Sequence, residues 1–244
     1  MVGEFQAKRI LIMNDHRDLG HSYSPLFSEF GEVTNDIAAF MLNPYHFKLI
    51  QFTGGADVTP SYYGDTSPKG LCGCNTARDE EEEKVFWKAY KTGVKMAGIC
   101  RGLQFINVMA GGKLMHHIDG HSGESHMVST SQSPSFYFQV NSAHHQMVIP
   151  PNDAFIISWT ATKLSDVYIG DKDEETDWYG PEIEGLYIPG FRAVGVQWHP
   201  EALGETFHGR KFYTELLKDY LEKTVTEFRN KYTGVKNVSI EASV

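Results

Sequence analysis

Short apolar runs alternate with amphipathic segments along most of the chain, and this alternation is typical of a sheet flanked by helices. In the first half, expected strands cover Arg9–Met13, Leu49–Thr53 and Val94–Ile99, and expected helices cover Asn35–Leu42, Asp79–Thr92 and Gln104–Ala110. The later segments are four expected strands, at Phe136–Val140, Ala154–Trp159, Glu184–Ile188 and Ala193–Gln197, and one long expected helix at Gly209–Arg229. Asn35 is the expected N-cap of the first helix. The pattern predicts an α/β fold.

Composition narrows the class of protein further. Of the 244 residues 41% are hydrophobic and 22% are charged, which excludes a disordered chain and favours one globular domain. We expect this domain over residues 1–233, followed by a loose tail over residues 234–244. The net charge of -9 argues against a nucleic-acid partner, because phosphate neutralisation needs clustered lysine and arginine.

The cysteine count and the hydropathy pattern indicate where such a chain would work. Three cysteines suit a reducing compartment rather than a disulfide scaffold. We see no apolar stretch long enough for a signal peptide or for a membrane span. The sequence therefore predicts a cytoplasmic protein with no membrane partner.

Cys100 is the candidate nucleophile, because it stands between a short apolar strand and a helix with Gly98 and Gly102 on either side. Small neighbours permit the tight strand–turn–helix bend of a nucleophile elbow. The start of the following helix offers N–H groups and a positive dipole end, which favour a thiolate. A lone cysteine in an apolar stretch is otherwise an inert core residue.

A histidine and a carboxylate follow the last expected strand at Val194–Glu201. His199 could accept the thiol proton and later protonate the leaving amine, while Glu201 could orient the imidazole ring. The Gly54-Gly55 turn ends another strand and offers exposed backbone N–H groups. Together with the amide of Arg101, this turn could form an oxyanion hole.

Five ordered sequence blocks give the chain a family resemblance. From about Leu49 to about Tyr220 it resembles the class I glutamine amidotransferase-like superfamily of Cys-His-Glu hydrolases. Within that superfamily it is most similar to the γ-glutamyl-γ-aminobutyrate hydrolase branch, through the Gly-Ile-Cys-Arg-Gly elbow, the Asp-Val-x-Pro-x-x-Tyr-Gly loop and the Asn-Ser-x-His-His-Gln block. The blocks are Phe52–Gly64, Arg78-Asp79, Gly98–Gly112, Val140–Gln146 and Gly195–Glu201.

The resemblance implies a fold and a site. The implied fold is flavodoxin-like α/β, a central, mostly parallel sheet with flanking helices and a small strand-rich flap. The implied site consists of the triad Cys100, His199 and Glu201, the backbone donors Gly55 and Arg101, and the substrate-binding residues Gly54, Gln104, Ser142, His144 and His145. No cofactor is implied.

The chain departs from this branch in two segments. Only some forty residues separate Ile12 from Gly54, which is closer to the compact start of glutaminase domains that feed a synthetase. The segment Ser165–Glu182 is longer and more acidic than the branch leads us to expect. Both departures leave the substrate open.

Other polar residues have alternative interpretations. His116, His117, His121 and His126 crowd one loop and could bind zinc, but a polar loop near the cleft is the favoured interpretation, and no metal site is predicted. Cys72 and Cys74 are interpreted as loop thiols. Glu184 is interpreted as a structural residue or as one that supports the site residues from behind. The acidic run Glu80–Glu83 is interpreted as a favourable contact with the helix dipole. The side chain of Arg101 could contact a substrate carboxylate or pair with a local acid.

These observations predict a cysteine hydrolase that cleaves a γ-glutamyl amide, either glutamine or a γ-glutamyl-amine, through a thioester. One alternative is a glutaminase subunit that supplies ammonia to a synthetase partner chain, since the chain has no G-x-x-x-x-G-K-[ST] nucleotide-binding loop of its own. Another is an inactive binding module. Intact Cys100, His199 and Glu201 argue against that alternative.

Overall fold

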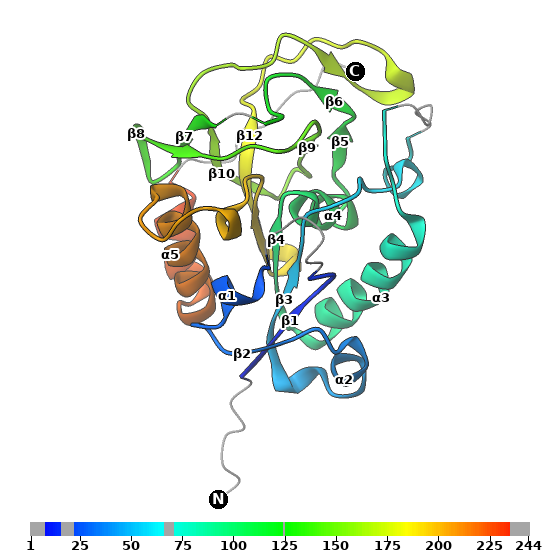
Figure 1. Cartoon of the computed structure of the whole chain (residues 1–244), viewed down its shortest axis with the longest axis vertical. Helices are drawn as coiled ribbons and strands as arrows, with labels where there is room; N and C mark the ends of the chain where they lie inside the picture. The colour runs from blue at the N-terminus through cyan, green and yellow to red at the C-terminus, as the bar shows by residue number, and fades with distance from the viewer. Residues whose placement is uncertain (1–7, 16–21, 66–70, 124, 235–244) are drawn as a thin grey trace, which may run out of the picture.

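The computed structural model describes residues 8–15, 22–65, 71–123 and 125–234. Its main feature is a nine-stranded sheet of order β2-β1-β3-β4-β13-β12-β10-β7-β8. The first five strands in this order run parallel, and the last four pair antiparallel. The predicted α/β fold with its large central sheet and flanking helices is confirmed (Figure 1).

The inner strands of the parallel half are buried on both faces, which explains why they are continuous apolar runs. Side chains alternate along β1, Arg9–Ile12, so that Ile10 and Ile12 enter one core and Leu11 enters the other. The other parallel strands are β2 Glu32–Thr34, β3 Phe47–Phe52, β4 Lys95–Ile99 and β13 Ala193–Val196.

Helices cover the two faces of the sheet (Figure 1). One core includes side chains of α1 Ser24–Phe27, α5 His208–Glu222 and α6 Val225–Tyr232. The other includes side chains of α2 Ile37–Leu42, α3 Thr76–Thr92 and α4 Arg101–Met109. Short 3-10 turns lie at Pro44–His46, Pro60–Tyr63, Asp171–Asp173, Pro189–Phe191 and Pro200–Ala202.

Two predictions about helix boundaries were wrong. Asp36, not Asn35, caps α2, because its side chain accepts the N–H of Ala39. The long C-terminal helix is two helices, since Lys223 and Thr224 leave the helical conformation and Thr224 forms a capping box with Glu227. In addition, α3 begins three residues earlier than expected because Asn75 accepts the N–H of Arg78.

The antiparallel half and the flap come from the middle of the chain. The antiparallel strands are β7 His126–Thr130, β8 Ser133–Val140, β10 Phe155–Thr160 and β12 Ile183–Ile188. Two small sheets form the predicted strand-rich flap, β5 Lys113–Met115 with β9 Met147–Ile149 and β6 His117–Ile118 with β11 Tyr168–Ile169.

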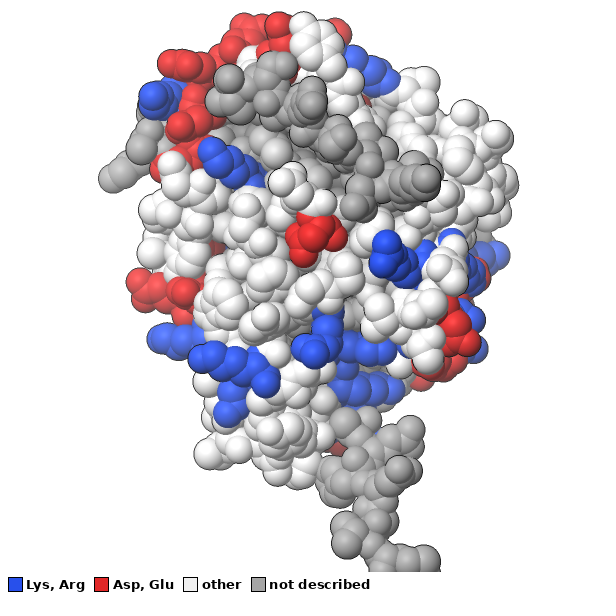
Figure 2. Space-filling model, turned by 180° about the vertical axis from the view of Figure 1, so that it is seen from behind, with Lys and Arg blue, Asp and Glu red and all other residues white. Residues whose placement is uncertain are grey.

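The acidic segment Ser165–Glu182 contains flap strand β11 and continues beyond it. Its acidic side chains Asp171, Glu174, Glu175 and Asp177 are exposed, and Figure 2 shows red side chains gathered at the end of the molecule where Figure 1 draws this segment. In the part of the chain that the structure describes, no helix has the length and apolarity needed to cross a membrane. The predicted tail, apart from Gly234, lies outside the described residues.

Candidate active site

Cys100 lies on a strained turn between β4 and α4, as an elbow requires. Its backbone has φ 52° and ψ -113°, in a region that non-glycine residues rarely occupy. The two flanking glycines have no room for a side chain, because a Cβ at Gly98 would lie 2.5 Å from the nitrogen of Leu103 and one at Gly102 would lie 2.1 Å from the carbonyl oxygen of Phe52. The packing of the turn therefore dictates the glycines around the cysteine.

The structure brings His199 and Glu201 to this turn. Parallel strands β4 and β13 are neighbours, so the residues after their carboxyl ends meet at one edge of the sheet. Nδ1 of His199 lies 2.6 Å from Oε1 of Glu201. Although burial lowers the pKa of His199, the sulfur of Cys100 and then the carboxylate of Glu201 raise it to about 11. A charged imidazole is the partner that a reactive thiolate needs.

The Gly54-Gly55 turn packs directly against this pair. A Cβ at Gly54 would lie 2.8 Å from Cε1 of His199 and 3.7 Å from Cβ of Cys100. The Gly54 N–H donates to the hydroxyl of Tyr23 over 3.1 Å. The predicted donor Gly55 follows with φ +126°, a conformation that requires glycine, and the Arg101 amide opens α4, where first-turn N–H groups have no partner within the helix.

Behind the turn lies a buried network that we call the arginine cluster, formed by Arg78, Asp79, Glu82 and Arg101. The Arg101 guanidinium, with 1% of its side chain exposed, pairs with Asp79 and Glu82. The guanidinium of Arg78 bonds Oε1 of Glu82 at 2.8 Å and the carbonyl oxygens of Thr53 and Gly54 at 2.9 Å each. The cluster thus ties the oxyanion turn to the elbow helix.

The arginine cluster bears on two interpretations made from the sequence, those of the Arg101 side chain and of the run Glu80–Glu83. The Arg101 side chain is paired with local acids and is not available to a substrate carboxylate. The interpretation of Glu80–Glu83 as a favourable contact with the helix dipole did not include the burial of Glu82, which is fully buried and pairs with Arg78 and Arg101. No periodicity reveals this, because Glu82 stands inside a run of four glutamates.

A cavity of about 230 Å³ opens beside Cys100. Of the predicted substrate-binding residues, Gln104, His144 and His145 line it, and so does Asp57. Nε2 of His145 lies 3.2 Å from both carboxylate oxygens of Asp57, and this contact raises the pKa of His145. Gly54 packs directly against Cys100, as described above. Ser142 is instead buried and donates its hydroxyl to the carbonyl of His121.

Deeper in the protein lies a second buried group, which we call the histidine cluster, formed by His121, His126, His144 and Glu184. One oxygen of Glu184, Oε1, lies 3.4 Å from Nδ1 of His121, 3.1 Å from Nε2 of His126 and 3.4 Å from Nε2 of His144. Although burial opposes ionisation, these histidines hold the pKa of Glu184 well below its usual value. The predicted loop histidines therefore divide, since His121 and His126 join this cluster and His117 contacts His145 instead.

Sequence reasoning missed two residues that position the site. The side chain of Asn141 clamps the His199 peptide, with Nδ2 donating to the His199 oxygen and Oδ1 accepting its N–H, both at 3.0 Å. Tyr23 receives the Gly54 N–H, and burial followed by the charge of Glu201 raises its pKa. Asn141 belongs to the sequence block Val140–Gln146, so this motif could have indicated that Asn141 contributes to the site. Nothing near Tyr23 in the sequence indicates its role.

The fold and this arrangement of residues define the class as glutamine amidotransferase-like class I. A family model described as peptidase C26 matches residues 45–169, and the chain belongs to that family. A glutamine amidotransferase-like protein of Lactococcus lactis is 28% identical over 69% of this chain and 72% of its own length. A protein of Mycobacterium tuberculosis described as a glutamine amidotransferase is 29% identical, over 66% of this chain and 52% of its own length.

Solved structures support the same fold. A glutamine amidotransferase from Thermotoga maritima aligns with a TM-score of 0.53 and 16% identity over 93% of this chain and 89% of its own. A protein of Thermoplasma acidophilum described as a GMP synthase subunit aligns with a TM-score of 0.59 and 16% identity, over 88% of this chain and 93% of its own. At these identities the likeness concerns the fold alone.

Proposed function

We propose that the protein hydrolyses a γ-glutamyl amide through a thioester on Cys100. The observation that carries this proposal is the strained elbow at Cys100 with the hydrogen-bonded His199–Glu201 pair beside it. Membership of the peptidase C26 family supports it. The cavity beside the sulfur is lined by Asp57, Gln104 and His145, whose polar groups suit the ammonium and carboxylate ends of a glutamyl substrate.

Each step of the proposed reaction uses a group at this site. The Cys100 thiolate attacks the γ-carbonyl carbon, and the amides of Gly55 and Arg101 stabilise the oxyanion. Protonated His199 gives its proton to the leaving nitrogen, so that the C–N bond breaks and the amine departs. Neutral His199 then accepts a proton from water, whose oxygen attacks the thioester carbon. Collapse of this intermediate breaks the C–S bond, releases glutamate and a proton, and restores the Cys100 thiolate beside protonated His199.

The test is mass spectrometry of the intact protein mixed with glutamine and with γ-glutamyl-amines, together with initial rates on each. We expect a glutamyl adduct that maps to Cys100 and a preference for an amide substituted on nitrogen over glutamine. Cys100→Ala should form no adduct. Turnover by Cys100→Ala at more than about a tenth of the parent rate would remove Cys100 from the mechanism.

The second candidate is a glutaminase subunit that supplies ammonia to a separate synthetase. The short segment between β1 and the Gly54-Gly55 turn favours it, and a structural neighbour is described as a GMP synthase subunit. The two candidates differ in what the isolated protein does. Near-zero activity alone, with glutaminase activity restored by one component of a lysate of the source cells, would replace the hydrolase proposal with this one.

A further inference from the structure

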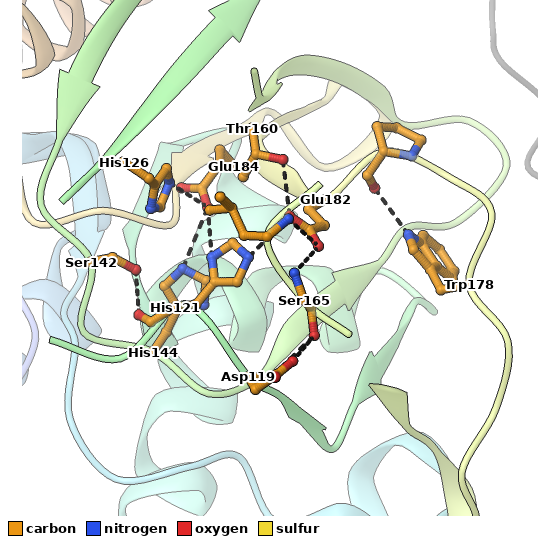
Figure 3. Close-up of polar contacts among 12 residues, drawn as sticks. Asp119, His121, His126, Ser142, His144, Thr160, Ser165, Trp178, Glu182 and Glu184 are labelled. Atoms are coloured by element: carbon orange, nitrogen blue, oxygen red, sulfur yellow. Dashed lines mark hydrogen bonds and ion pairs between the residues drawn. The ribbon is translucent and has the colours of Figure 1, made fainter. Parts of the chain in front are cut away.

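The histidine cluster joins three segments that are far apart in the sequence (Figure 3). His121 lies between β6 and β7, His144 lies between β8 and β9, and Glu184 lies in β12. The side chains of His121, His144 and Glu184 are 1%, 2% and 0% exposed. Their ligand-type atoms lie within 4.8 Å of one another. Such burial requires that every polar atom have a partner.

The tautomer of His144 follows from its other ring nitrogen. Nδ1 lies 3.0 Å from the carbonyl oxygen of Gln146, which can only accept a hydrogen bond, so Nδ1 carries the hydrogen. In the neutral ring Nε2 then presents a lone pair. This lone pair faces Oε1 of Glu184 at 3.4 Å, and neither atom has a hydrogen-bond partner among the residues that the structure describes.

His121 repeats the pattern with its nitrogens exchanged. Nε2 lies 3.3 Å from Oε2 of Glu182, a carboxylate that also accepts the N–H groups of Leu164 and Ser165 and the hydroxyl of Tyr168. Nε2 of His121 is therefore the protonated nitrogen. In the neutral ring its Nδ1 presents the second lone pair, 3.4 Å from the same oxygen of Glu184 and again with no hydrogen-bond partner in the described part of the chain.

A proton on each nitrogen could separate these facing lone pairs. Although burial lowers the pKa of His121, hydrogen bonds to Glu182 and Glu184 raise it to about 9. Burial lowers the pKa of His144, however, and a second proton there would place two imidazolium ions side by side. The rings of His121 and His144 have centroids only 4.7 Å apart, so their positive charges would repel each other in a dry environment. One divalent cation would satisfy both nitrogens and the carboxylate at once.

We propose that His121 Nδ1, His144 Nε2 and Glu184 Oε1 bind a divalent transition-metal ion of the zinc class. Zinc binds histidine nitrogen and carboxylate oxygen at about 2.0–2.1 Å, so two ligand atoms of a tetrahedral site lie about 3.3–3.4 Å apart. Both nitrogens lie 3.4 Å from Oε1 of Glu184.

The surrounding groups match the outer shell of a metal site. Histidine ligands of zinc donate their other ring N–H to a carboxylate or a carbonyl, which fixes the tautomer. Glu182 serves His121 in this way, and the Gln146 carbonyl serves His144. His126 approaches the same carboxylate oxygen to 3.1 Å and would hold it in place. Because His144 also lines the cavity beside Cys100, the ion would anchor one cavity wall to the central sheet.

The first experiment measures bound metal in the full chain, expressed without a histidine tag in zinc-supplemented medium and passed over a chelating resin. We expect about one zinc ion per chain by elemental analysis. Glu184→Gln should lower the bound zinc at least about tenfold, since even outer residues of such sites contribute 10–100-fold to affinity. His208→Ala is the matched control, because this histidine is exposed on α5, and it should keep the zinc.

A second measurement keeps the proposal testable if Glu184→Gln does not fold. The unaltered protein is unfolded in chelator, freed of metal and refolded with Co²⁺, whose visible spectrum reports its ligands. We expect one equivalent of Co²⁺ in a low-symmetry site with nitrogen and oxygen ligands, displaced by Zn²⁺. No bound metal in the unaltered protein after both procedures would overturn the proposal, and so would full zinc content in folded Glu184→Gln. Neither readout depends on turnover, so the proposed hydrolase activity stands or fails separately.

Discussion

Two buried polar clusters adjoin the cavity at Cys100, and they satisfy their charges in opposite ways. The arginine cluster pairs two guanidinium groups with two carboxylates. In the histidine cluster the Glu184 carboxylate meets ring nitrogens whose lone pairs face it when the rings are neutral, and neither of its oxygens has a hydrogen-bond partner within the described ranges. A buried carboxylate needs positive charge close by. The chain supplies it in the first cluster, and in the second we expect it to come from a bound ion.

Removing the sulfur of Cys100, which lies beside the cavity that both clusters adjoin, should give the largest effect on turnover. Cys100→Ala should lower turnover about 10³-fold or more, because no other group in the proposed mechanism can form the thioester. Both clusters keep all their contacts in this variant, so its denaturation midpoint should stay close to that of the parent protein. Initial rates and urea denaturation of the same sample check the two expectations. A large loss of stability would mean that the elbow, and not only its sulfur, had been disturbed.

The arginine cluster is tested by Arg101→Met. Among the described residues this variant leaves Asp79 with no ion pair and leaves Arg78 as the only cation on Glu82, so the free energy of unfolding should fall by about 3–5 kcal/mol. Urea denaturation measures it. Lys84→Met, which removes an exposed cation from the same helix α3, is the control and should change stability by less than about 0.5 kcal/mol. Equal effects of the two substitutions would show that burial of the pair contributes nothing.

Removal of metal by a chelator should affect the stability contributed by the histidine cluster and leave that of the arginine cluster unchanged. Refolding in a chelator should destabilise the unaltered protein by about 3 kcal/mol, the contribution of a ligand present at a hundred times its dissociation constant. Arg101→Met should lose a similar further amount, because its defect lies elsewhere, and Glu184→Gln should lose nothing. Denaturation curves with and without added zinc provide the comparison. The same response to chelator in Glu184→Gln as in the parent would place any metal outside the histidine cluster.

A glycine substitution tests how the arginine cluster holds the oxyanion turn. A Cβ at Gly55 would lie 2.4 Å from Nη1 of Arg78, and the φ of +126° adds backbone strain, so Gly55→Ala should cost about 2 kcal/mol and lower turnover. Gly111→Ala is the matched control, because its φ of +94° carries strain while nothing lies within 4 Å of its new Cβ. Equal losses of stability and unchanged turnover in both variants would mean that the contact with Arg78 does not set the geometry of the Gly54-Gly55 turn.

The smallest effect is expected from charges that belong to neither cluster. Neutralising Asp171, Glu174, Glu175 and Asp177 should change stability by less than about 0.5 kcal/mol, because these side chains are exposed. We expect a change in substrate choice or partner binding instead, measured as relative rates on a panel of γ-glutamyl amides and by affinity capture. Unchanged rates and unchanged capture would leave this segment as a solvated loop.

The sequence predicted the local parts of the site better than its long-range parts. The elbow, its glycines and the His199-Pro-Glu201 turn are short motifs whose geometry is set by neighbouring residues, so they were visible in the sequence. The buried clusters join residues that are up to 63 positions apart, as His121 and Glu184 are, and no periodicity marks such pairs. Glu82 and His121 also stand in polar runs, where burial of one member leaves no sign in composition.

The same distinction applies to the fold. Apolar strands buried on both faces, such as β1 and β4, were predicted nearly to the residue. Strands β2, β5, β6, β9 and β11 were missed, because they are only two or three residues long. The five-residue strand β7 was also missed, because it begins in the histidine-rich run that was interpreted as a polar loop. The break between α5 and α6 was missed because apolar residues keep helical spacing across it, while the capping box at Thr224 decides where the second helix starts.

The clamp between Asn141 and the His199 peptide has a consequence for how proteins of this kind diversify. Fifty-seven residues separate the two clamp partners, and they include the acidic segment and the antiparallel strands β10 and β12. Because the histidine is fixed by direct hydrogen bonds to Asn141, the lengths of the intervening surface loops do not determine where it stands. Insertions and deletions there can accumulate without displacing the imidazole. Evolution can therefore exchange the rim of the cavity as a module while the proton-transfer geometry is inherited unchanged.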